Sequence, residues 1–523
     1  MELLPTRATF APGEPVEVEV RGAGGALEVS LWHLDAVVAT VRSDAGVARF
    51  EAQPEGGYGV EAEGATSALD VLADPLDRPR YGFVSDFSAG RDTAGVAEGI
   101  RRFHLNAVQF YDWMYRHAQL LPPANDFEDA LGRRLSLDTV RRLTAAVSAA
   151  GSLPLAYAAV YAVGREAWPD WADEGLYRPD GTPWTLGDDF LWNVDPSSAR
   201  WLDFFTDQLT QARASVAFAG FHLDQYGAPK QALRCNGSLV DLADAFPKLI
   251  GRVAAELPEA RLIFNNVNDF PVWTTAAAPQ DATYIEVWPP HDRLRHLADL
   301  VSKARALAPE RAVILAAYLS AYTGDAAAAA VAERLQLATV FSHGGATLLH
   351  GEEDAVLTEA YYADHGRIGT DALRAGRLYY DFAVRFGDLL FDRRAIDVTR
   401  TRLGGINEEI KLDAPVPVST DAAPGVLWAR AIELSHGVLV SLIDLSPQDD
   451  DRWDAPKAPE RPLEGVQVKV ERSARSAPVV AFATPDAPRL RRLVSERQDR
   501  HDSVRLPGFS TWALVWIRNE LED

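Results

Sequence analysis

The protein has 523 residues, of which 47% are hydrophobic, and its 52 Lys and Arg against 75 Asp and Glu give a formal net charge of −23. At about 150 residues per domain, this length predicts about three folding units. A surface this acidic repels a phosphate backbone, so nucleic acid is excluded as a partner. No apolar run reaches the roughly 18 residues of a membrane-spanning helix, which predicts no membrane association. The single cysteine, Cys235, excludes an intramolecular disulfide.

The first residues, MELLPTRATF, lack the basic and apolar regions of a secretory signal. This predicts a cytoplasmic protein, or a secreted one if a leader has been removed from the sequence. The oligomeric state is left open.

Residues 1–78 contain short alternating runs separated by glycine-rich stretches. The runs are EPVEVEV (Glu14 to Val20), ALEVSLWHL (Ala26 to Leu34) and GYGVEAEG (Gly57 to Gly64). Period-two alternation between turn signals is typical of a small antiparallel sandwich. The segment PLDRPR, from Pro75 to Arg80, brackets a polar stretch with prolines and is interpreted as a linker.

Residues 79–392 change pattern, because apolar strand-like runs are followed repeatedly by helix-like stretches rich in Ala, Leu and Arg. Eight such runs predict a parallel sheet covered by helices, and their number favours a (β/α)8 barrel over an open sheet. The runs are YGFVSDF (from Tyr81), NAVQFYD (Asn106), LPLAYAAVY (Leu153), FAGFHLD (Phe218), RLIFNNVND (Arg261), ATYIEVWP (Ala282), AVILAAYL (Ala312) and ATLLHGEED (Ala346).

Residues 393–523 lose the helical alternation, which predicts an antiparallel β-sandwich. The expected strands are GVLWARAIEL (from Gly425), GVLVSLIDL (Gly437), GVQVKVERS (Gly465), APVVAFAT (Ala477) and TWALVWI (Thr511). Between the second and third of these, QDDDRWDAPKAPERP is predicted to be a long exposed loop.

The active site of such a barrel lies at the carboxyl ends of its strands. Acidic and aromatic side chains are frequent at the predicted ends, whereas phosphate-cradling glycines are absent from them, which suits a neutral ligand rich in hydroxyl groups, such as a sugar. The residues predicted from these ends and their neighbours to bind substrate are Asp86, Asp112, Tyr161, His222, Gln225, Asn266, Trp288, His350 and Glu352.

Two motifs stand out from the other strand ends. Asp224 closes a strand in FHLDQYG, and Glu286 closes another in YIEVWPP. We expect strands four and six to face each other across the barrel mouth, so that one carboxylate attacks an anomeric carbon while the other carboxyl protonates the leaving oxygen. Carboxyl groups about 5–5.5 Å apart give retention of configuration, and roughly 6.5–9.5 Å gives inversion.

Each of these residues also has a structural interpretation. Asp224 could cap the following helix, and Glu286 could pair with Arg293. Asp112 could have the purely structural role of holding Arg116 or His117 in place.

Other candidates have equally plain alternatives. His222 could be a satisfied core histidine, and Trp288 could serve packing. Of the adjacent Asn265 and Asn266, at most one should face the ligand. His350 and Glu352 are followed by further acids that suggest a metal site, but without an HExxH pattern or a second histidine at ligand spacing no metal and no cofactor are expected.

Taken together and in order, YGFVSDF, NAVQFYDWMYRH, FAGFHLDQYG, FNNVND and YIEVWPP resemble glycoside hydrolase family 66, which contains endo-dextranases and cycloisomaltooligosaccharide glucanotransferases. The resemblance covers the predicted barrel and implies an immunoglobulin-like domain before it and an antiparallel β-domain after it. It also implies that Asp224 is the nucleophile and Glu286 the acid/base, in a retaining double displacement on α-1,6-linked glucan.

Within that family, the cyclising enzymes carry a large carbohydrate-binding insertion in the seventh repeat of the barrel. Only a short stretch separates AVILAAYL from ATLLH here, which favours an endo-dextranase. The alternatives are a transglycosylase or exo-hydrolase acting on isomaltooligosaccharides and, from a different class, a non-catalytic glucan-binding protein.

Overall fold

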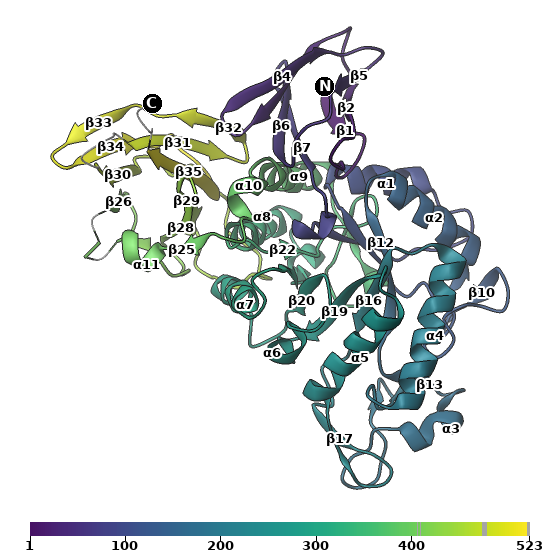
Figure 1. The fold of residues 1–523 in the computed structure, drawn as a ribbon. Helices are drawn as coiled ribbons and strands as arrows, with labels where there is room; N and C mark the ends of the chain where they lie inside the picture. Colours follow the sequence, from purple (N-terminus) through teal and green to yellow (C-terminus); the bar gives the residue numbers. More distant parts are fainter. Residues whose placement is uncertain (405, 408, 473–477, 520–523) are drawn as a thin grey trace.

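The structure is a computed structural model that describes residues 1–404, 406–407, 409–472 and 478–519. Three parts follow one another along the chain: an N-terminal pair of β-sheets, a central barrel surrounded by helices, and a C-terminal β-structure (Figure 1). The predicted boundary at 78/79 falls between the 3₁₀ helix η1 (Pro75–Asp77) and the first barrel strand. The boundary at 392/393 falls between α10 (Gly387–Leu390) and β25 (Ile396–Asp397).

The N-terminal part consists of two sheets with strand orders β1-β2-β5 and β4-β3-β6-β7, drawn in purple in Figure 1. Alternate residues such as Val18, Leu31 and Val60 point between the sheets and form one buried cluster, as the period-two pattern predicts. The strands are β1 (Glu2–Pro5), β2 (Val16–Arg21), β3 (Glu28–His33), β4 (Ala36–Arg42), β5 (Val47–Phe50), β6 (Gly56–Ala62) and β7 (Ala65–Val71).

The central part is a closed barrel of eight parallel strands, and all eight predicted runs form its strands. The sheet order follows the sequence, and a bridge between Tyr81 and Leu348 joins the last strand to the first. The (β/α)8 prediction is therefore confirmed. The strands are β8 (Tyr81–Val84), β9 (Ala107–Phe110), β12 (Leu153–Ala159), β16 (Gly220–Asp224), β19 (Arg261–Val267), β20 (Ala282–Glu286), β21 (Ala312–Ala316) and β22 (Ala346–Thr347).

Helices follow the barrel strands in turn and cover the outside of the barrel. Their starts have the expected caps: Asp92, Ser198 and Asp325 each accept hydrogen bonds from backbone N–H groups of the first turn. The helices are α1 (Thr93–Arg102), α2 (Leu137–Ala149), α4 (Ala199–Val216), α5 (Leu242–Glu256), the short α6 (Val272–Thr275), α7 (Leu294–Leu307), α8 (Ala326–Ser342) and α9 (Thr370–Arg385).

Long loops after the third and fourth strands extend the carboxyl end of the barrel. Backbone hydrogen bonds in both directions between Tyr177 and Leu233 tie these two loops into one projection, labelled by α3 and β17 in Figure 1. The loop elements are β13 (Ala162–Gly164), α3 (Trp168–Trp171), η2 (Ala172–Glu174), β14 (Thr185–Leu186), β15 (Leu191–Asn193), β17 (Gln231–Leu233) and β18 (Leu239–Asp241). Smaller loop elements are β10 (Asp126–Glu128), β11 (Arg134–Ser136), η3 (Ser320–Thr323), β23 (Ala355–Val356), η4 (Tyr362–Asp364) and β24 (Gly366–Arg367).

The C-terminal part packs a seven-stranded sheet on a four-stranded one, with Val440, Val468 and Val515 in the shared core. All five predicted strands are present, although Ser473 and Ala477 at their ends lie outside the described residues, as do 520–523 of the predicted domain. The elements are α11 (Thr399–Arg402), β26 (Ile410–Asp413), β27 (Val418–Ser419), β28 (Leu427–Leu434), β29 (Gly437–Asp444), β30 (Gln467–Glu471), β31 (Pro478–Thr484), β32 (Ala487–Arg492), β33 (Ser495–Gln498), β34 (His501–Arg505) and β35 (Trp512–Asn519).

The expectation of an exposed loop after β29 holds only in part, because exposed residues alternate with buried ones along it. Asp451, Trp453 and Lys457 are buried, because this loop lies against the segment that connects β20 to α7. The indole Nε1 of Trp453 donates to the carbonyl oxygen of His291 at 2.7 Å, and the backbone N–H of Leu294 donates to the carbonyl of Asp451 at 2.9 Å. The sequence of the loop is mostly polar, and this composition led to the prediction that the loop is exposed.

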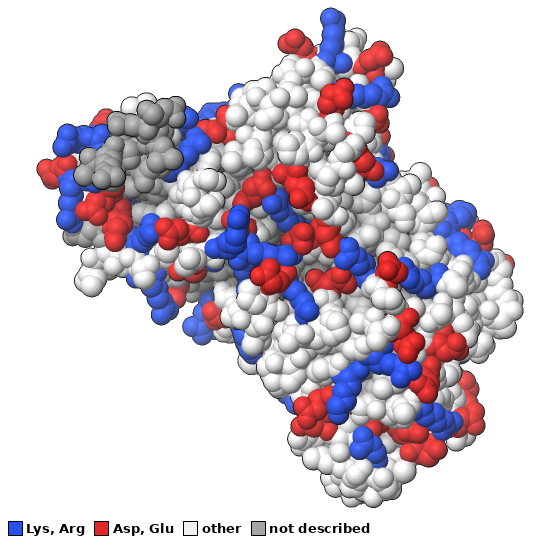
Figure 2. Space-filling view, in the orientation of Figure 1, with Lys and Arg blue, Asp and Glu red and all other residues white. Residues whose placement is uncertain are grey.

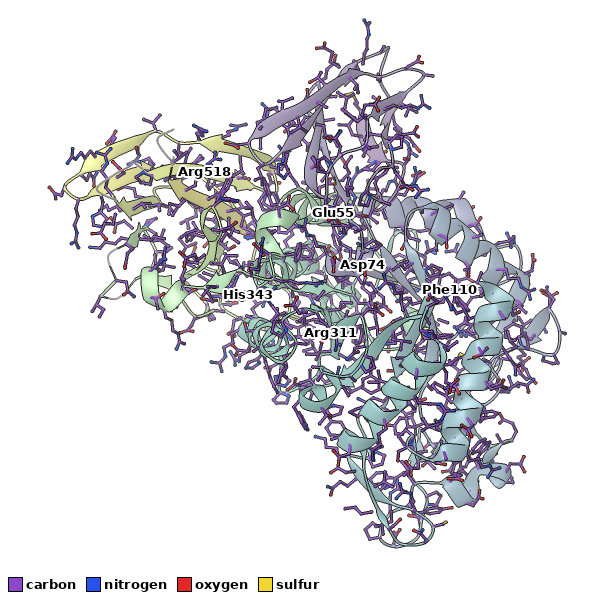
Figure 3. The ribbon with its side chains drawn as sticks, in the orientation of Figure 1. Glu55, Asp74, Phe110, Arg311, His343 and Arg518 are labelled. Atoms are coloured by element: carbon purple, nitrogen blue, oxygen red, sulfur yellow. The ribbon has the colours of Figure 1, made fainter. Side chains whose placement is uncertain are left out.

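Buried ion pairs and close backbone packing join the three parts. Arg80, at the end of the predicted linker, makes a two-pronged contact with Asp70 in which both side chains are almost wholly buried. Strand β6 lies so close to α9 that a Cβ atom at Gly57 would overlap the carbonyl oxygen of Val384. Arg518, labelled in Figure 3, reaches from β35 to pair with the N-terminal part through Asp35.

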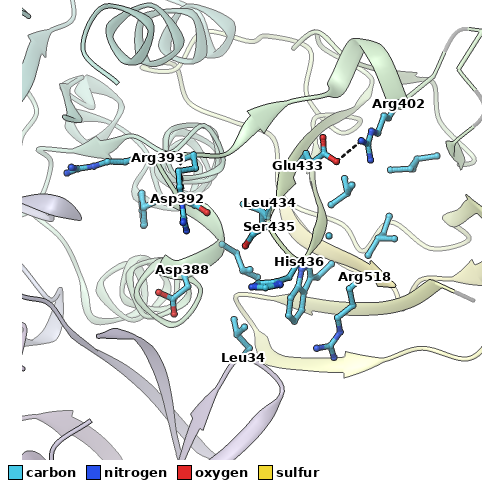
Figure 4. A pocket seen from close by; sticks show the side chains of 18 of the residues that line it. Leu34, Asp388, Asp392, Arg393, Arg402, Glu433, Leu434, Ser435, His436 and Arg518 are labelled. Atoms are coloured by element: carbon cyan, nitrogen blue, oxygen red, sulfur yellow. Dashed lines mark hydrogen bonds and ion pairs between the residues drawn. The ribbon is translucent and has the colours of Figure 1, made fainter. Parts of the chain in front are cut away.

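A cavity of about 1340 Å³ lies where the three parts meet (Figure 4). Its walls include Asp77 and Arg78, which precede β8, so it is at the amino ends of the barrel strands. Its charged groups are largely paired with one another, as in Arg78 with Asp388 at 2.7 Å and Arg402 with Glu433 at 2.6 Å. Figure 2 shows Lys and Arg beside Asp and Glu over this face rather than a field of one sign.

Among the described residues, no helix has both the length and the apolar character needed to cross a bilayer.

Candidate active site

Asp224 and Glu286 are the last residues of β16 and β20, at the carboxyl end of the barrel. The expectation that these two strands face each other across the mouth of the barrel is wrong. Strand β19 pairs with both of them, so the carboxyl-bearing strands are separated by a single strand. Neighbouring strands are only about 4.8 Å apart, and the inward-pointing side chains therefore converge.

One amide group joins the two carboxyl groups. Asn265, on the intervening strand β19, donates through Nδ2 to Asp224 Oδ1 at 2.7 Å and to Glu286 Oε2 at 3.0 Å. The other oxygen of each carboxyl group accepts from a tyrosine: Tyr157 donates to Asp224 Oδ2 at 2.8 Å, and Tyr318 donates to Glu286 Oε1 at 2.8 Å. All four carboxyl oxygens therefore accept a hydrogen bond from the protein.

The surrounding protein makes both groups hard to ionise together. Burial, reinforced by the neighbouring Glu286, raises the pKa of Asp224 to about 7 against the hydrogen bonds from Asn265 and Tyr157. Burial also raises the pKa of Glu286, against the hydrogen bonds from Asn265 and Tyr318. Two adjacent buried carboxyl groups disfavour each other's ionisation, so the pair resists carrying two negative charges.

The two carboxyl groups line a cavity of about 970 Å³ at the carboxyl end of the barrel. Several tyrosines line it, among them Tyr318 and Tyr362. The hydroxyl oxygens of these two are 3.4 Å apart, and that of Tyr362 is 3.1 Å from the hydroxyl oxygen of the buried Tyr284. Tyr362 also stacks on Tyr111 at a ring distance of 4.2 Å. Aromatic faces next to hydroxyl and carboxyl groups suit a sugar ring, which presents C–H groups on its faces and hydroxyls on its edge.

Four of the residues predicted to bind substrate line this cavity: Asp112, His222, Gln225 and Trp288. His222 lies on the same barrel face as Asp224, as strand alternation predicts, and its Nδ1 is 3.0 Å from the hydroxyl of Tyr81. Trp288 is 39% exposed and meets Tyr318 edge to face.

The side chain of Gln225 is already engaged by the protein. Its Nε2 donates to the carbonyl of Phe270 at 3.0 Å, and its Oε1 accepts from the backbone N–H of Gly227 at 2.6 Å. Gln225 therefore shapes the cavity wall. Asp112 contacts Arg133 at 4.0 Å and not Arg116 or His117, the partners considered from the sequence.

Three other candidates from the early strands do not line the cavity. Asp86 lies at the surface and accepts from the backbone N–H of Ser88 at 2.9 Å. Tyr161 is buried beside the loop after β16, where its hydroxyl donates to the carbonyl of Ala228 at 2.9 Å. Asn266 points to the outer face of β19 and donates to the carbonyl of Tyr284 at 2.8 Å. The geometry thus favours Asn265, and not Asn266, as the asparagine that faces the site.

His350 and Glu352 also lie outside the cavity. His350 stacks on Phe103 at a ring distance of 4.1 Å and contacts Glu333 at 2.8 Å between Nε2 and Oε1. Glu352 accepts from the hydroxyl of Ser85 at 3.1 Å. Both side chains make buried contacts within the protein. Among the described residues, no group of three or more His, Cys, Asp or Glu side chains could hold a metal ion.

The sequence interpretation named Asn265 only as the alternative to Asn266. It did not name four other residues that line the cavity: Tyr157, Tyr318, Tyr362 and Lys230. A signal existed for Tyr157, which lies two residues before the end of β12 and so on the face of its last residue, Ala159. No comparable signal marks Tyr362, which reaches the site from the 3₁₀ helix η4 in the loop after β22.

Known proteins that are similar to this chain include two enzymes of the same name. Two cycloisomaltooligosaccharide glucanotransferases of Niallia circulans are 28% identical over 368 residues and 26% identical over 398 residues, covering 60% and 65% of this chain. The matches span 38% and 40% of those proteins, so the chain corresponds to less than half the length of these relatives.

Solved structures support the same architecture. A cycloisomaltooligosaccharide glucanotransferase from Paenibacillus sp., complexed with cycloisomaltoheptaose, matches with a TM-score of 0.87 at 19% identity over 99% of both chains. A maltogenic α-amylase from Thermotoga neapolitana matches with a TM-score of 0.54 at 10% identity, over 86% of this chain and 100% of that one. The model of glycosyl hydrolase family 66 matches residues 5–516. The chain belongs to glycosyl hydrolase family 66.

Proposed function

We propose that the protein is a retaining glycoside hydrolase that cleaves α-1,6-linked glucan internally, with Asp224 as nucleophile and Glu286 as acid/base. The observation that carries this proposal is the pair of carboxyl groups held by the single amide of Asn265 in a tyrosine-lined cavity. The substrate class rests on the family and on the name of two relatives, cycloisomaltooligosaccharide glucanotransferase.

The spacing of the two carboxyl groups supports retention. Asp224 Oδ1 and Glu286 Oε2 are 2.7 Å and 3.0 Å from one nitrogen atom, so they cannot be farther apart than the sum of these distances. That limit is close to the roughly 5–5.5 Å of retaining enzymes and below the roughly 6.5 Å at which inversion begins. There is too little room between these two oxygens for an inverting enzyme's water together with the sugar.

The reaction follows from these positions. Asp224 attacks C1 of the glucosyl unit, the bond from C1 to O6 of the leaving chain breaks, and Glu286 gives its proton to O6. The product is a β-glycosyl ester on Asp224 and an ionised Glu286. Glu286 then removes a proton from water, whose oxygen attacks C1 and releases Asp224, so that the α configuration is restored.

Transglycosylation is a second candidate function. The named relatives are glucanotransferases, and a crystallised one matches this chain over 99% of both lengths, so the short seventh repeat does not by itself separate the two activities. A sugar hydroxyl that replaces water in the second step gives transfer, and a hydroxyl of the same chain gives a cyclic product.

Three measurements on dextran test the proposal. Proton NMR during the reaction should show the α-anomer appearing first, which reports retention. Chromatography should show a ladder of intermediate isomaltooligosaccharides, whereas glucose or isomaltose alone would indicate exo cleavage. Mass spectrometry separates linear from cyclic products, because a cyclic product lacks one water.

Variants test the residue roles. Asp224→Asn and Glu286→Gln should each lower kcat on dextran by at least about a thousandfold. Asp86→Asn is a matched control, because Asp86 follows the first barrel strand but lies outside the cavity. This variant should retain activity. Unchanged hydrolysis by both Asp224→Asn and Glu286→Gln would refute the mechanism, and a wild-type protein that binds dextran without cleaving it would support a non-catalytic glucan-binding protein instead.

A further inference from the structure

A third carboxyl group lines the catalytic cavity, and the protein gives it no hydrogen bond. The side chain of Asp112 forms part of the cavity wall and keeps 13% of its surface exposed there. Every carboxyl oxygen of Asp224 and Glu286 accepts from the protein, whereas no donor among the described residues reaches the carboxyl oxygens of Asp112. Its nearest cation, the guanidinium of Arg133, is 4.0 Å away. A largely buried carboxyl group without donors is costly to the fold, so we expect its partners to come from a ligand.

The backbone of Asp112 is held in place although its conformation is unfavourable. Its φ of 50° lies in the left-handed region, which residues other than glycine rarely adopt. Arg133 fixes this turn, because its Nη2 donates to the backbone carbonyl oxygen of Asp112 at 2.8 Å. Arg133 is fixed in turn by the buried Asp129, which accepts from its Nε at 2.7 Å. The protein therefore positions a carboxyl group that it leaves unpaired, as is typical of a functional residue.

Asp112 lies across the barrel mouth from the acid/base. It follows the second barrel strand, β9, and strands two and six are opposite each other in a closed ring of eight. Tyr157, on the third strand, lies between Asp112 and the nucleophile: burial raises its pKa, and the charges of Asp224 and Asp112 add to the effect. Because Glu286 protonates the leaving chain, the glucosyl unit under attack extends from Asp224 toward Asp112.

We propose that Asp112 binds the 3- and 4-hydroxyls of the glucosyl unit attacked by Asp224, and that this contact selects α-1,6-linked over α-1,4-linked glucan. This inference rests on the proposed function and deepens it by assigning the residue that sets the linkage specificity.

The choice of hydroxyls follows from the shape of the sugar. C4 is the ring atom opposite C1, so a ring with C1 at Asp224 turns its 3- and 4-hydroxyls away from the nucleophile and toward Asp112. The two hydroxyls are adjacent and equatorial, and each can donate to one oxygen of the same carboxyl group. Both oxygens of Asp112 then gain the donors that the protein does not supply.

The linkage specificity follows from which hydroxyls a glucan leaves free. An internal unit of an α-1,6-linked chain keeps its 2-, 3- and 4-hydroxyls, because its links use C1 and O6. An internal unit of an α-1,4-linked chain has O4 in a glycosidic bond and has no hydrogen to donate there. Such a chain leaves one oxygen of Asp112 unpaired and presses its next sugar against the cavity wall. A site built to bind a hydroxyl discriminates strongly against a ligand that lacks it.

The test combines three nitrophenyl glycosides with two variants. The substrates are 4-nitrophenyl α-isomaltotrioside and two analogues whose ring attached to nitrophenol lacks either the 4-hydroxyl or the 2-hydroxyl. Release of nitrophenol reports only the cleavage in which this ring is attacked. Asp112→Ala removes the carboxyl group, whereas Asp112→Asn keeps its volume and one acceptor oxygen. Melting curves check that each variant folds, and Asp112→Asn carries the comparison if Asp112→Ala does not fold.

Loss of the 4-hydroxyl should lower kcat/KM of the wild type by about 10- to 100-fold, the range of a hydrogen bond to a charged group. It should lower kcat/KM of Asp112→Ala by less than about threefold, and that of Asp112→Asn by an intermediate factor. Loss of the 2-hydroxyl is the matched control and should cost all three proteins the same factor. An equal 4-deoxy penalty in the wild type and the variants would overturn the assignment of Asp112.

Polymeric substrates test the consequence for specificity. Asp112→Ala should lower kcat/KM on dextran by at least about a hundredfold, since both hydrogen bonds are lost, and unchanged hydrolysis would overturn the proposal. The wild type should cleave amylose at least about a hundredfold more slowly than dextran, and a smaller difference would overturn the role in linkage specificity. A wild-type protein inactive on dextran and on the isomaltotrioside would refute the proposed function instead.

Discussion

A substitution of Asp112 can measure how much a buried carboxyl group lowers the free energy of unfolding of this protein. It follows β9 in the left-handed region of backbone conformation, with a φ of 50°, and its side chain lies at the wall of the cavity. Its nearest cation, in Arg133, is 4.0 Å away. Burial, with a contribution from the charge of Asp129, raises its pKa from 3.8 to about 7 against the opposing effect of Arg133.

The direction of the effect on stability follows from linkage. A carboxyl group with a raised pKa in the folded state stabilises that state fully below its unfolded pKa, and this contribution is lost as the pH rises through the folded value. For Asp112 the loss falls between about pH 4 and pH 7. At 1.36 kcal/mol for each pKa unit, the full loss is at most about 4 kcal/mol.

Asp112→Asn removes this penalty, because an amide of the same size does not ionise. The variant and the wild type should melt at similar temperatures near pH 4.5, and the variant should melt several degrees higher at pH 8. Near-UV circular dichroism is a suitable readout, because Trp113 next to it is fully buried. A difference in melting temperature that stays constant from pH 4.5 to pH 8 would refute the buried, largely neutral state of Asp112.

Three further changes address the site and its supports. Tyr318→Phe removes a donor to Glu286 and should move the basic limb of the pH profile up by roughly one to two pH units, whereas an unmoved limb would contradict the contact. Trp453→Phe keeps an aromatic ring but loses the hydrogen bond to His291, and should lower kcat on dextran several-fold by loosening the loop after Glu286; unchanged kcat would mean that the loop holds itself. Arg80→Gln leaves Asp70 buried without its partner and should destabilise the protein by about 3–5 kcal/mol, seen as a lower melting temperature; a change within error would contradict the burial of that pair.

The barrel was predictable from the sequence because every strand is a compact apolar run followed by a helical pattern. The ends of two of those runs place Asp224 and Glu286 at the carboxyl edge, and parallel strands bring such ends together whatever the loops do. Alternation along a strand also predicted correctly that His222 shares a face with Asp224. These inferences use only the period of a strand and the direction of the chain.

The remaining site residues depend on information that a strand pattern does not contain. The choice between Asn265 and Asn266 is set by the phase of β19 relative to the barrel, and both residues end the same apolar run. Tyr362 enters from a loop whose course is set by tertiary contacts. His350 and Glu352 lie outside the cavity, because their side chains turn to Glu333 and Ser85.

The sheet order gives a physical reason for an amide at position 265. When two carboxyl groups extend from strands four and six, the inward side chain of strand five lies between them. A carboxylate there would add a third negative charge, and an apolar side chain would leave two oxygens without donors in a site that already raises the pKa of Asp224. A lysine would favour the ionised form of both groups, whereas the proposed mechanism needs one of them protonated. An amide donates to both without a charge of its own.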